Sequence, residues 1–176
     1  MNPWEKQHTL MDISNQKIAS SPELNKTSIL YSALILEETS ELFDGLSKIL
    51  LRIADEEHRQ LFNEVLNVQG VMHNSSLRIR ELLKSMPEFN DPLLVDECVE
   101  LADASTDITV VNCGLAVSVG FNGQDCYDDV ADSNLSKANP DTGVIDKTAD
   151  GKWIKGRDYK EPNLEKVIYG ETREKN

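Results

Sequence analysis

The chain has few cysteines, no long apolar stretch and a shortage of basic residues. No run reaches the about 18 apolar residues of a membrane-spanning helix, and the polar N-terminal segment is not typical of a signal peptide. Cys98, Cys113 and Cys126 lack paired short spacings, which predicts reduced thiols in a cytoplasmic protein. The 18 Lys and Arg against 31 Asp and Glu give a net charge of -13, which argues against a protein that grips nucleic acid through its phosphates.

What the chain does contain is helix-forming sequence. At 176 residues it is long enough for one domain with a real core. Apolar residues recur with a helical period, with breaks at residues 20–22 and 86–87. Asn2, which is followed by a proline, and Asn25 are suitable N-caps. The sequence therefore predicts five helices, which cover approximately residues 2–19, 26–53, 55–85, 92–119 and 124–138.

The character of the sequence changes after residue 140. Residues 142–155 contain two strand-like runs around Asp150-Gly151, which predicts a β-hairpin, and residues 171–176 read as a frayed tail. The expected fold class is all-α, an antiparallel helical bundle with a small C-terminal β-hairpin appendage. In this interpretation, residues 1–140 form the bundle with the functional site, and residues 141–170 form the appendage of the same domain.

Two of the predicted helices carry acidic residues on the face that their apolar residues mark as buried. In the helix at 26–53, Glu38 and Glu41 lie within about 40° of Leu34 on the apolar face, and Glu37 lies at its edge. In the helix at 92–119, one stripe contains all of the following acids: Asp96, Glu100, Asp103 and Asp107. Side chains three or four residues apart lie about 5–6 Å from each other on a helix. Each helix therefore offers a row of carboxylates.

Two rows of carboxylates on core-facing helices predict a cation. An ionised carboxylate inside a core needs a partner, because desolvation of a lone charge costs many kcal/mol. Oxygen ligands without His or Cys favour Mg²⁺ or Mn²⁺ over zinc, most simply Mg²⁺ with a phosphorylated substrate. The alternative is that both rows are solvated faces of surface helices. Added Mg²⁺ or Mn²⁺ would raise the melting temperature only in the first case.

The acid motifs stand in an order that resembles the MazG-like all-α nucleoside triphosphate pyrophosphohydrolases. Glu37-Glu38-Thr39-Ser40-Glu41 is similar to the Glu-Glu-x-x-Glu helix of that superfamily, and Glu100-Leu101-Ala102-Asp103 is similar to its Glu-x-x-Asp helix. Further segments resemble the phosphoribosyl-ATP pyrophosphohydrolase-like branch, at residues 103–108, 114–121, 133–137, 151–156 and 159–164. The gap of 59 positions between Glu41 and Glu100 is longer than is typical. The helix at 55–85 fills this gap, either within the bundle or at an oligomer interface.

The resemblance implies hydrolysis between the α and β phosphates of a nucleoside triphosphate, which gives a monophosphate and pyrophosphate. It implies Mg²⁺, with Mn²⁺ as a substitute, held by the ligands Glu38, Glu41, Glu100 and Asp103. Glu37 or Asp107 would orient or deprotonate the attacking water, or hold a further metal. Lys137, with Asn134 one turn before it, would bind the distal phosphates together with Lys155. The alternatives are that Lys137 is a lysine at a helix end that complements the helix dipole, and that Lys155 lies in a solvated loop.

The resemblance leaves the substrate and the pathway open. Nucleotide-pool housecleaning and hydrolysis of phosphoribosyl-ATP in histidine synthesis are both compatible with it. Relatives are usually dimers or tetramers, which implies a cytoplasmic homo-oligomer with no nucleic acid or membrane as partner. Trp153 either stacks on a base or packs the predicted hairpin against the bundle. Two other classes compete, a non-catalytic helical interaction module and a di-iron bundle, although only residues 5–8 match the Glu-x-x-His motif that a di-iron bundle uses twice.

Overall fold

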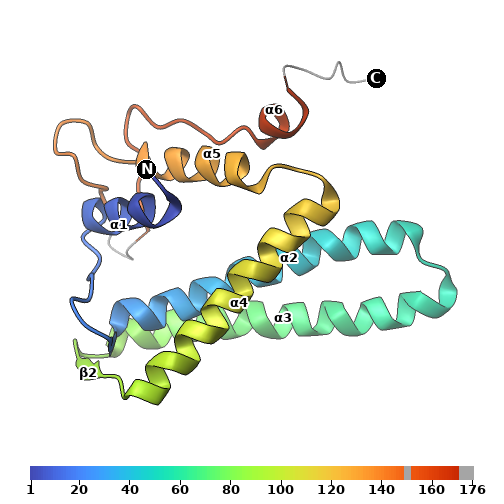
Figure 1. Ribbon diagram of the computed structural model, residues 1–176, viewed down its shortest axis with the longest axis horizontal. Helices are drawn as coiled ribbons and strands as arrows, with labels where there is room; N and C mark the ends of the chain where they lie inside the picture. The colour runs from blue at the N-terminus through green and yellow to red at the C-terminus, as the bar shows by residue number, and fades with distance from the viewer. Residues whose placement is uncertain (149–151, 171–176) are drawn as a thin grey trace. The chain divides into compact units, whose positions relative to one another are not determined.

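A computed structural model describes residues 1–148 and 152–170, except for the side chains of residues 56–58 and 61–62. Its elements in chain order are α1 (Pro3–Ile13), β1 (Glu23–Asn25), α2 (Lys26–Ile53), α3 (Glu56–Ser85), β2 (Asn90–Pro92), α4 (Val95–Val119), α5 (Gly123–Leu135) and α6 (Leu164–Tyr169) (Figure 1). The chain divides into two compact units, which we call the hairpin unit (Ser21–Leu93) and the terminal unit (Met1–Ser20 with Leu94–Asn176). Helices form almost all of the regular structure, which confirms the predicted all-α class.

The hairpin unit consists of two long antiparallel helices, α2 and α3, which pack side by side (Figure 1). Asn25 caps α2 as predicted, because its side-chain oxygen accepts a hydrogen bond from the Ser28 backbone N–H at 3.1 Å. Mostly small residues are buried in this unit's helices; they are Ala33, Ser40 and Ser47 on α2 and Ser76 and Leu83 on α3. The two helices therefore approach each other through small side chains, and many large aliphatic ones lie on other faces.

A short antiparallel sheet joins the start of α2 to the end of α3. β1 pairs with β2 in the register Glu23–Pro92, Leu24–Asp91 and Asn25–Asn90. The prediction of a C-terminal β-hairpin is therefore wrong in its position, and so is the helix start expected at residues 90–92. Within 142–155, the described residues show an isolated antiparallel bridge, Lys147–Trp153, and the expected Asp150-Gly151 turn lies outside the described residues. Three-residue strands are too short to show an alternating pattern, so the sequence does not reveal them.

In the terminal unit, a buried lysine fixes α1 on α5 through two carboxylates that stay exposed. The Lys6 side chain is 8% exposed, and its ammonium lies 2.8 Å from Asp128 and 2.6 Å from Asp132. Hydrogen bonds to these two carboxylates raise the pKa of Lys6, and the bond to Lys6 holds the pKa of Asp128 below its usual range. The Tyr127 hydroxyl donates to the Pro3 carbonyl at 2.8 Å. These contacts give α1 a fixed position on the helix that leads to the predicted substrate residues.

Beyond α5, the described residues 136–148 and 152–163 form a C-terminal loop that folds back onto the end of that helix. The Gly156 N–H donates to the Lys137 carbonyl at 3.1 Å. The approach is so close that a Cβ at position 156 would lie 2.4 Å from the Ala138 carbonyl oxygen. Arg157 donates two hydrogen bonds to the Asp141 carboxylate, at 3.0 and 2.9 Å. The loop is thus held by backbone contacts that only glycine permits and by a bidentate ion pair.

Two further helix ends differ from the sequence-based expectation, and one short helix was not expected. α1 ends at Ile13 rather than near residue 19, because Asn15 adopts a positive φ of 51° and turns the chain. α5 ends three residues earlier than expected, and α6 was not predicted.

Among the described residues, none of the helices by itself combines the length and the apolar composition of a membrane span. α4 and α5 meet the length and composition test only jointly, with a bend of 114° at their junction.

Candidate functional site

The first acid row lies on the side of α2 that is turned away from α3. At about 100° per residue, Glu38 and Glu41 lie more than a quarter turn from the buried Ser40 and Ser47. Both carboxylates are exposed. Partial burial nevertheless raises the pKa of Glu38, and the negative charges of Glu41 and Glu37 add to this effect. This stretch of α2 therefore concentrates negative charge where a cation can approach.

Glu37 lies at the edge of this row and has a partner of its own. The Arg80 guanidinium, from α3, donates a hydrogen bond to the Glu37 carboxylate at 2.7 Å. The Glu37 side chain is 22% exposed. The contact fixes Glu37 in orientation, so Glu37 has a different setting from Glu38 and Glu41 although all three belong to one motif.

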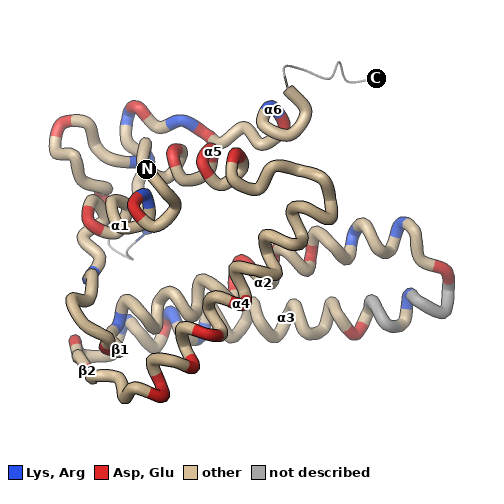
Figure 2. Tube along the Cα trace, in the orientation of Figure 1, with Lys and Arg blue, Asp and Glu red and all other residues tan. Residues whose placement is uncertain are grey.

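The second acid row lies on the first half of α4, where Figure 2 shows acidic positions gathered along the trace. Glu97 closes the start of this helix, because its carboxylate accepts a hydrogen bond from the Leu94 N–H at 2.9 Å. Gly120 ends the helix in the left-handed conformation, with φ 93°. Between these caps, Glu100, Asp103 and Asp107 follow at helical spacing on one face, and all three are exposed.

The prediction that both acid rows lie on buried helix faces is wrong for the structure as described, because Glu37 is half-buried and the other five carboxylates are exposed, namely Glu38, Glu41, Glu100, Asp103 and Asp107. A helical period identifies which residues share a face. It does not identify what covers that face. Glu38 and Glu41 belong to the hairpin unit, whereas Glu100 and Asp103 belong to the terminal unit. Their assignment as one set of metal ligands stays a prediction.

The donor set suits a hard divalent cation by its chemistry. Every candidate ligand is a carboxylate, and Mg²⁺ and Mn²⁺ prefer oxygen donors. Within either unit, the described residues bring no three His, Cys, Asp or Glu side chains close enough to hold a metal ion. Neither unit alone therefore supplies a complete cage, and each helix offers two carboxylates at i and i+3.

Two of the predicted substrate residues do meet, Asn134 in the last turn of α5 and Lys137 just beyond its end. The Lys137 ammonium donates a hydrogen bond to the Asn134 side-chain oxygen at 2.7 Å. The same ammonium lies 5.5 Å from the centre of the Trp153 ring, in a cation–π contact. Sequence reasoning missed this contact between Lys137 and Trp153, since the two residues are 16 positions apart. The three side chains form a compact polar and aromatic group at the end of α5.

Lys155 lies apart from this group, in the C-terminal loop. Its ammonium donates to Glu161 at 3.1 Å and lies 4.3 Å from the centre of the Tyr159 ring. The hydrogen bond to Glu161 raises the pKa of Lys155. The side chain is exposed, and its contacts are those of a surface lysine with local partners.

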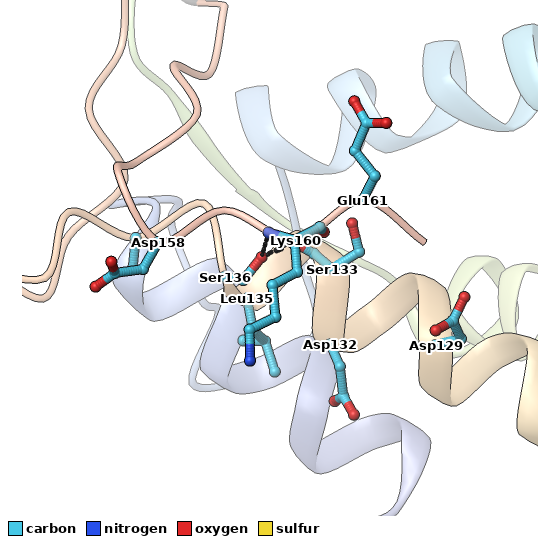
Figure 3. A pocket seen from close by; sticks show the side chains of 9 residues that line it. Asp129, Asp132, Ser133, Leu135, Ser136, Asp158, Lys160 and Glu161 are labelled. Carbon is cyan, nitrogen blue, oxygen red and sulfur yellow. Dashed lines mark hydrogen bonds between the residues drawn. The ribbon is translucent and has the colours of Figure 1, made fainter. Parts of the chain in front are cut away.

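An open pocket of about 440 Å³ lies between α5 and the C-terminal loop (Figure 3). Its lining includes Asp129, Asp132, Asp158 and Glu161. Figure 3 shows these carboxylates pointing in different directions. Asp132 pairs with Lys6, and Asp129 accepts a hydrogen bond from the Asn163 N–H at 2.6 Å. These acids hold the loop and α1 in place, and they do not converge on a ligand position.

Comparison with known proteins adds a likeness in fold. No family model matches the chain, and no curated protein matches it. The chain is similar to a crystal structure from Exiguobacterium sp. 255-15 whose printed name is "putative NTP pyrophosphohydrolase". The TM-score is 0.58 and the identity 18%, over 94% of this chain and 91% of the other. The two proteins share an all-α fold across nearly their whole lengths.

Proposed function

We propose that this protein is a Mg²⁺-dependent nucleotide pyrophosphohydrolase, which cleaves a nucleoside triphosphate to the monophosphate and pyrophosphate. The observation that carries the proposal is the ordered pair of acid motifs, residues 37–41 on α2 and residues 100–103 on α4. The likeness in fold to a protein named as an NTP pyrophosphohydrolase supports it. The absence of His and Cys from both motifs supports an oxygen-ligated Mg²⁺, or Mn²⁺, as cofactor.

The proposed residue roles follow the chemistry of the side chains. The metal ligands would be Glu38, Glu41, Glu100 and Asp103, and a bound Mg²⁺ would neutralise charge on the phosphates. Glu37, which Arg80 holds in place, would orient or deprotonate the attacking water, and Asp107 is the alternative for this role. Lys137 would give its ammonium to the distal phosphates, with Asn134 as its positioning partner.

The substrate region in this proposal is the end of α5 and the C-terminal loop. Trp153 presents an aromatic surface beside Lys137, which suits a nucleotide with a base and a charged phosphate chain. Lys155 would contribute further positive charge once its contact with Glu161 opens. We assign the protein to cytoplasmic nucleotide-pool housecleaning, as a homo-oligomer without nucleic acid or membrane partners.

A comparison of three variants tests this function. Pyrophosphate release is measured over a panel of nucleoside triphosphates, with and without Mg²⁺ or Mn²⁺. Glu41→Gln and Asp103→Asn should each reduce turnover by at least about 100-fold, since loss of even an outer-shell metal partner typically costs 10- to 100-fold. Glu64→Gln changes an exposed glutamate of α3 outside both motifs and should leave turnover unchanged. Equal activity in all three variants would refute the assignment of the acid motifs.

A further inference from the structure

Arg80 of α3 is a basic residue with most of its hydrogen-bond donors open. Its guanidinium donates one hydrogen bond, at 2.7 Å, to the Glu37 carboxylate, and this is its only polar contact among the described residues. A guanidinium has five N–H donors in a planar fork. Since one donor is used here, the other four have no partner in the part of the chain that the structure describes. The side chain is also 43% exposed, so these donors can reach a ligand from solvent.

Arg80 lies on the face of the hairpin unit that also carries Glu41. At about 100° per residue, Glu37 and Glu41 are rotated by about 60° and 100° from the buried Ser40. Arg80 is rotated by about 40° from the buried Ser76, in the same sense. Because α2 and α3 run antiparallel, equal senses of rotation bring these side chains to one face. The hydrogen bond between Glu37 and Arg80 agrees with this geometry.

The acid motif on α2 needs positive charge if it is to bind a nucleotide. The three glutamates of residues 37–41 outweigh the charge of one Mg²⁺, and the phosphates of a nucleotide add further negative charge. Lys48 and Lys84, from the same unit, pair with acids outside both motifs. Among the described residues, Arg80 is the one cation that pairs with this motif. It therefore brings positive charge to the place where phosphate would meet the acids.

Stability alone does not account for an arginine at this position. A partly exposed ion pair contributes little to stability, because water screens the charges and two long side chains lose conformational freedom. The neighbouring positions in the contact between α2 and α3 are small or apolar, and they include Ser40, Ser76 and Leu83. The planar fork of a guanidinium matches the oxygens of a phosphate, which it can bind with two parallel hydrogen bonds. The open donors of Arg80 thus suit an anion.

We propose that Arg80 is a substrate-binding residue, which binds a phosphate group of the nucleotide beside the Mg²⁺ that Glu38 and Glu41 would hold. This inference rests on the proposed function. It adds a phosphate ligand from the hairpin unit to Lys137, which belongs to the terminal unit. Glu37 orients the guanidinium through its Oε2 atom, and its Oε1 atom stays available for the attacking water.

Calorimetric titration of the full-length chain with inorganic pyrophosphate in Mg²⁺ tests this role without turnover. Arg80→Gln should raise the Kd for pyrophosphate by about 10- to 100-fold, the usual cost of a lost hydrogen bond to a charged group. Arg80→Lys keeps the charge but loses the planar fork, so it should raise the Kd by a smaller factor. Arg78→Gln is the matched control, because Arg78 is exposed on the opposite side of α3, and it should keep the wild-type Kd.

Glu37→Gln separates direct binding from an effect through Glu37. This variant keeps the guanidinium and removes one negative charge, so it should bind pyrophosphate at least as tightly as the wild type. Equal weakening by Glu37→Gln and Arg80→Gln would overturn the inference, because Arg80 would then act only through its partner. A Kd of Arg80→Gln that equals that of Arg78→Gln would also overturn it, and so would a wild type that binds no pyrophosphate in Mg²⁺.

The outcome is separable from that of the proposed function. Circular dichroism shows whether each variant is folded, and Arg80→Lys decides the question if Arg80→Gln is not. Binding that depends on Arg80, in a protein that hydrolyses no nucleotide, would support the phosphate site and contradict the hydrolase. Nucleotide hydrolysis with the wild-type KM and kcat in Arg80→Gln would support the hydrolase and overturn the phosphate site.

Discussion

Replacement of Gly156 by alanine tests the packing of the C-terminal loop on α5. An alanine Cβ would lie 2.4 Å from the Ala138 carbonyl oxygen and 3.0 Å from the Lys137 carbonyl oxygen. Real carbon–oxygen contacts are about 3.2 Å or longer, so the loop must retreat by nearly 1 Å. Because the obstacle is backbone, no side-chain rotation can relieve the overlap.

The structure gives the expected size of the effect. Retreat of the loop stretches the hydrogen bond from Gly156 to the Lys137 carbonyl, now 3.1 Å long. A lost hydrogen bond of this type costs about 0.5–1.5 kcal/mol, and overpacking costs about 1–3 kcal/mol. We expect Gly156→Ala to reduce the free energy of unfolding by about 2–3 kcal/mol. In a chain of this size the melting temperature would then fall by roughly 4–12 °C.

Thermal unfolding followed by circular dichroism measures this effect. Gly114→Ala is the control in the same unit, because the residue is inside α4 and a Cβ at position 114 would meet no described atom within 4 Å beyond its chain neighbours and the nearby backbone of its own helix. That variant should gain about 0.5–1 kcal/mol, since alanine is the better helix former. A Gly156→Ala protein as stable as the wild type would refute the close approach of the loop to α5.

Three further predictions concern charged and polar groups. Ser47→Ala should raise the free energy of unfolding by about 1 kcal/mol in chemical denaturation, because it removes a buried hydroxyl that lacks a partner among the described residues. Asp128 has a depressed pKa in the folded state, so it stabilises the fold above its unfolded pKa and loses this effect as pH falls through the folded value. Asp128→Asn, which removes a partner of Lys6, should therefore lower the melting temperature at pH 7. The difference in melting temperature between this variant and the wild type should be smaller in strong acid. Glu41→Gln should lower the pKa of Glu38, measured by NMR titration, and raise the metal-free stability at pH 7, because Glu41 is one of the charges that hold this pKa up.

The helices were predictable because their signals are local. Asn25 caps α2 at the expected residue, and the apolar period gives the α2 span from Lys26 to Ile53 without error. The strands were not predictable, because β1 and β2 are three residues long and pair across more than 60 positions. The same limit applies to Lys6 and Asp132, which are 126 positions apart and carry no mutual sequence signal.

The candidate site was predictable only in part. Helical spacing places Glu38 with Glu41, and Glu100 with Asp103, and it brings Asn134 to Lys137. Helical spacing did not predict the exposure of these acids correctly. The leucines and valines beside the acids show which residues share a helix face, but they do not show whether another element covers that face. The placement of Trp153 beside Lys137 depends on how the C-terminal loop folds back, and that fold depends on the backbone contact at Gly156.

The chemical products give the most direct test of the central claim, that the acid rows of α2 and α4 serve hydrolysis between the α and β phosphates. Phosphorus NMR would follow purified protein with a panel of nucleoside triphosphates in Mg²⁺. We predict that a nucleoside monophosphate and inorganic pyrophosphate form in equal amounts, and that Glu41→Gln abolishes both. A nucleoside diphosphate with orthophosphate, or no turnover of any nucleotide with Mg²⁺ or Mn²⁺, would contradict the claim.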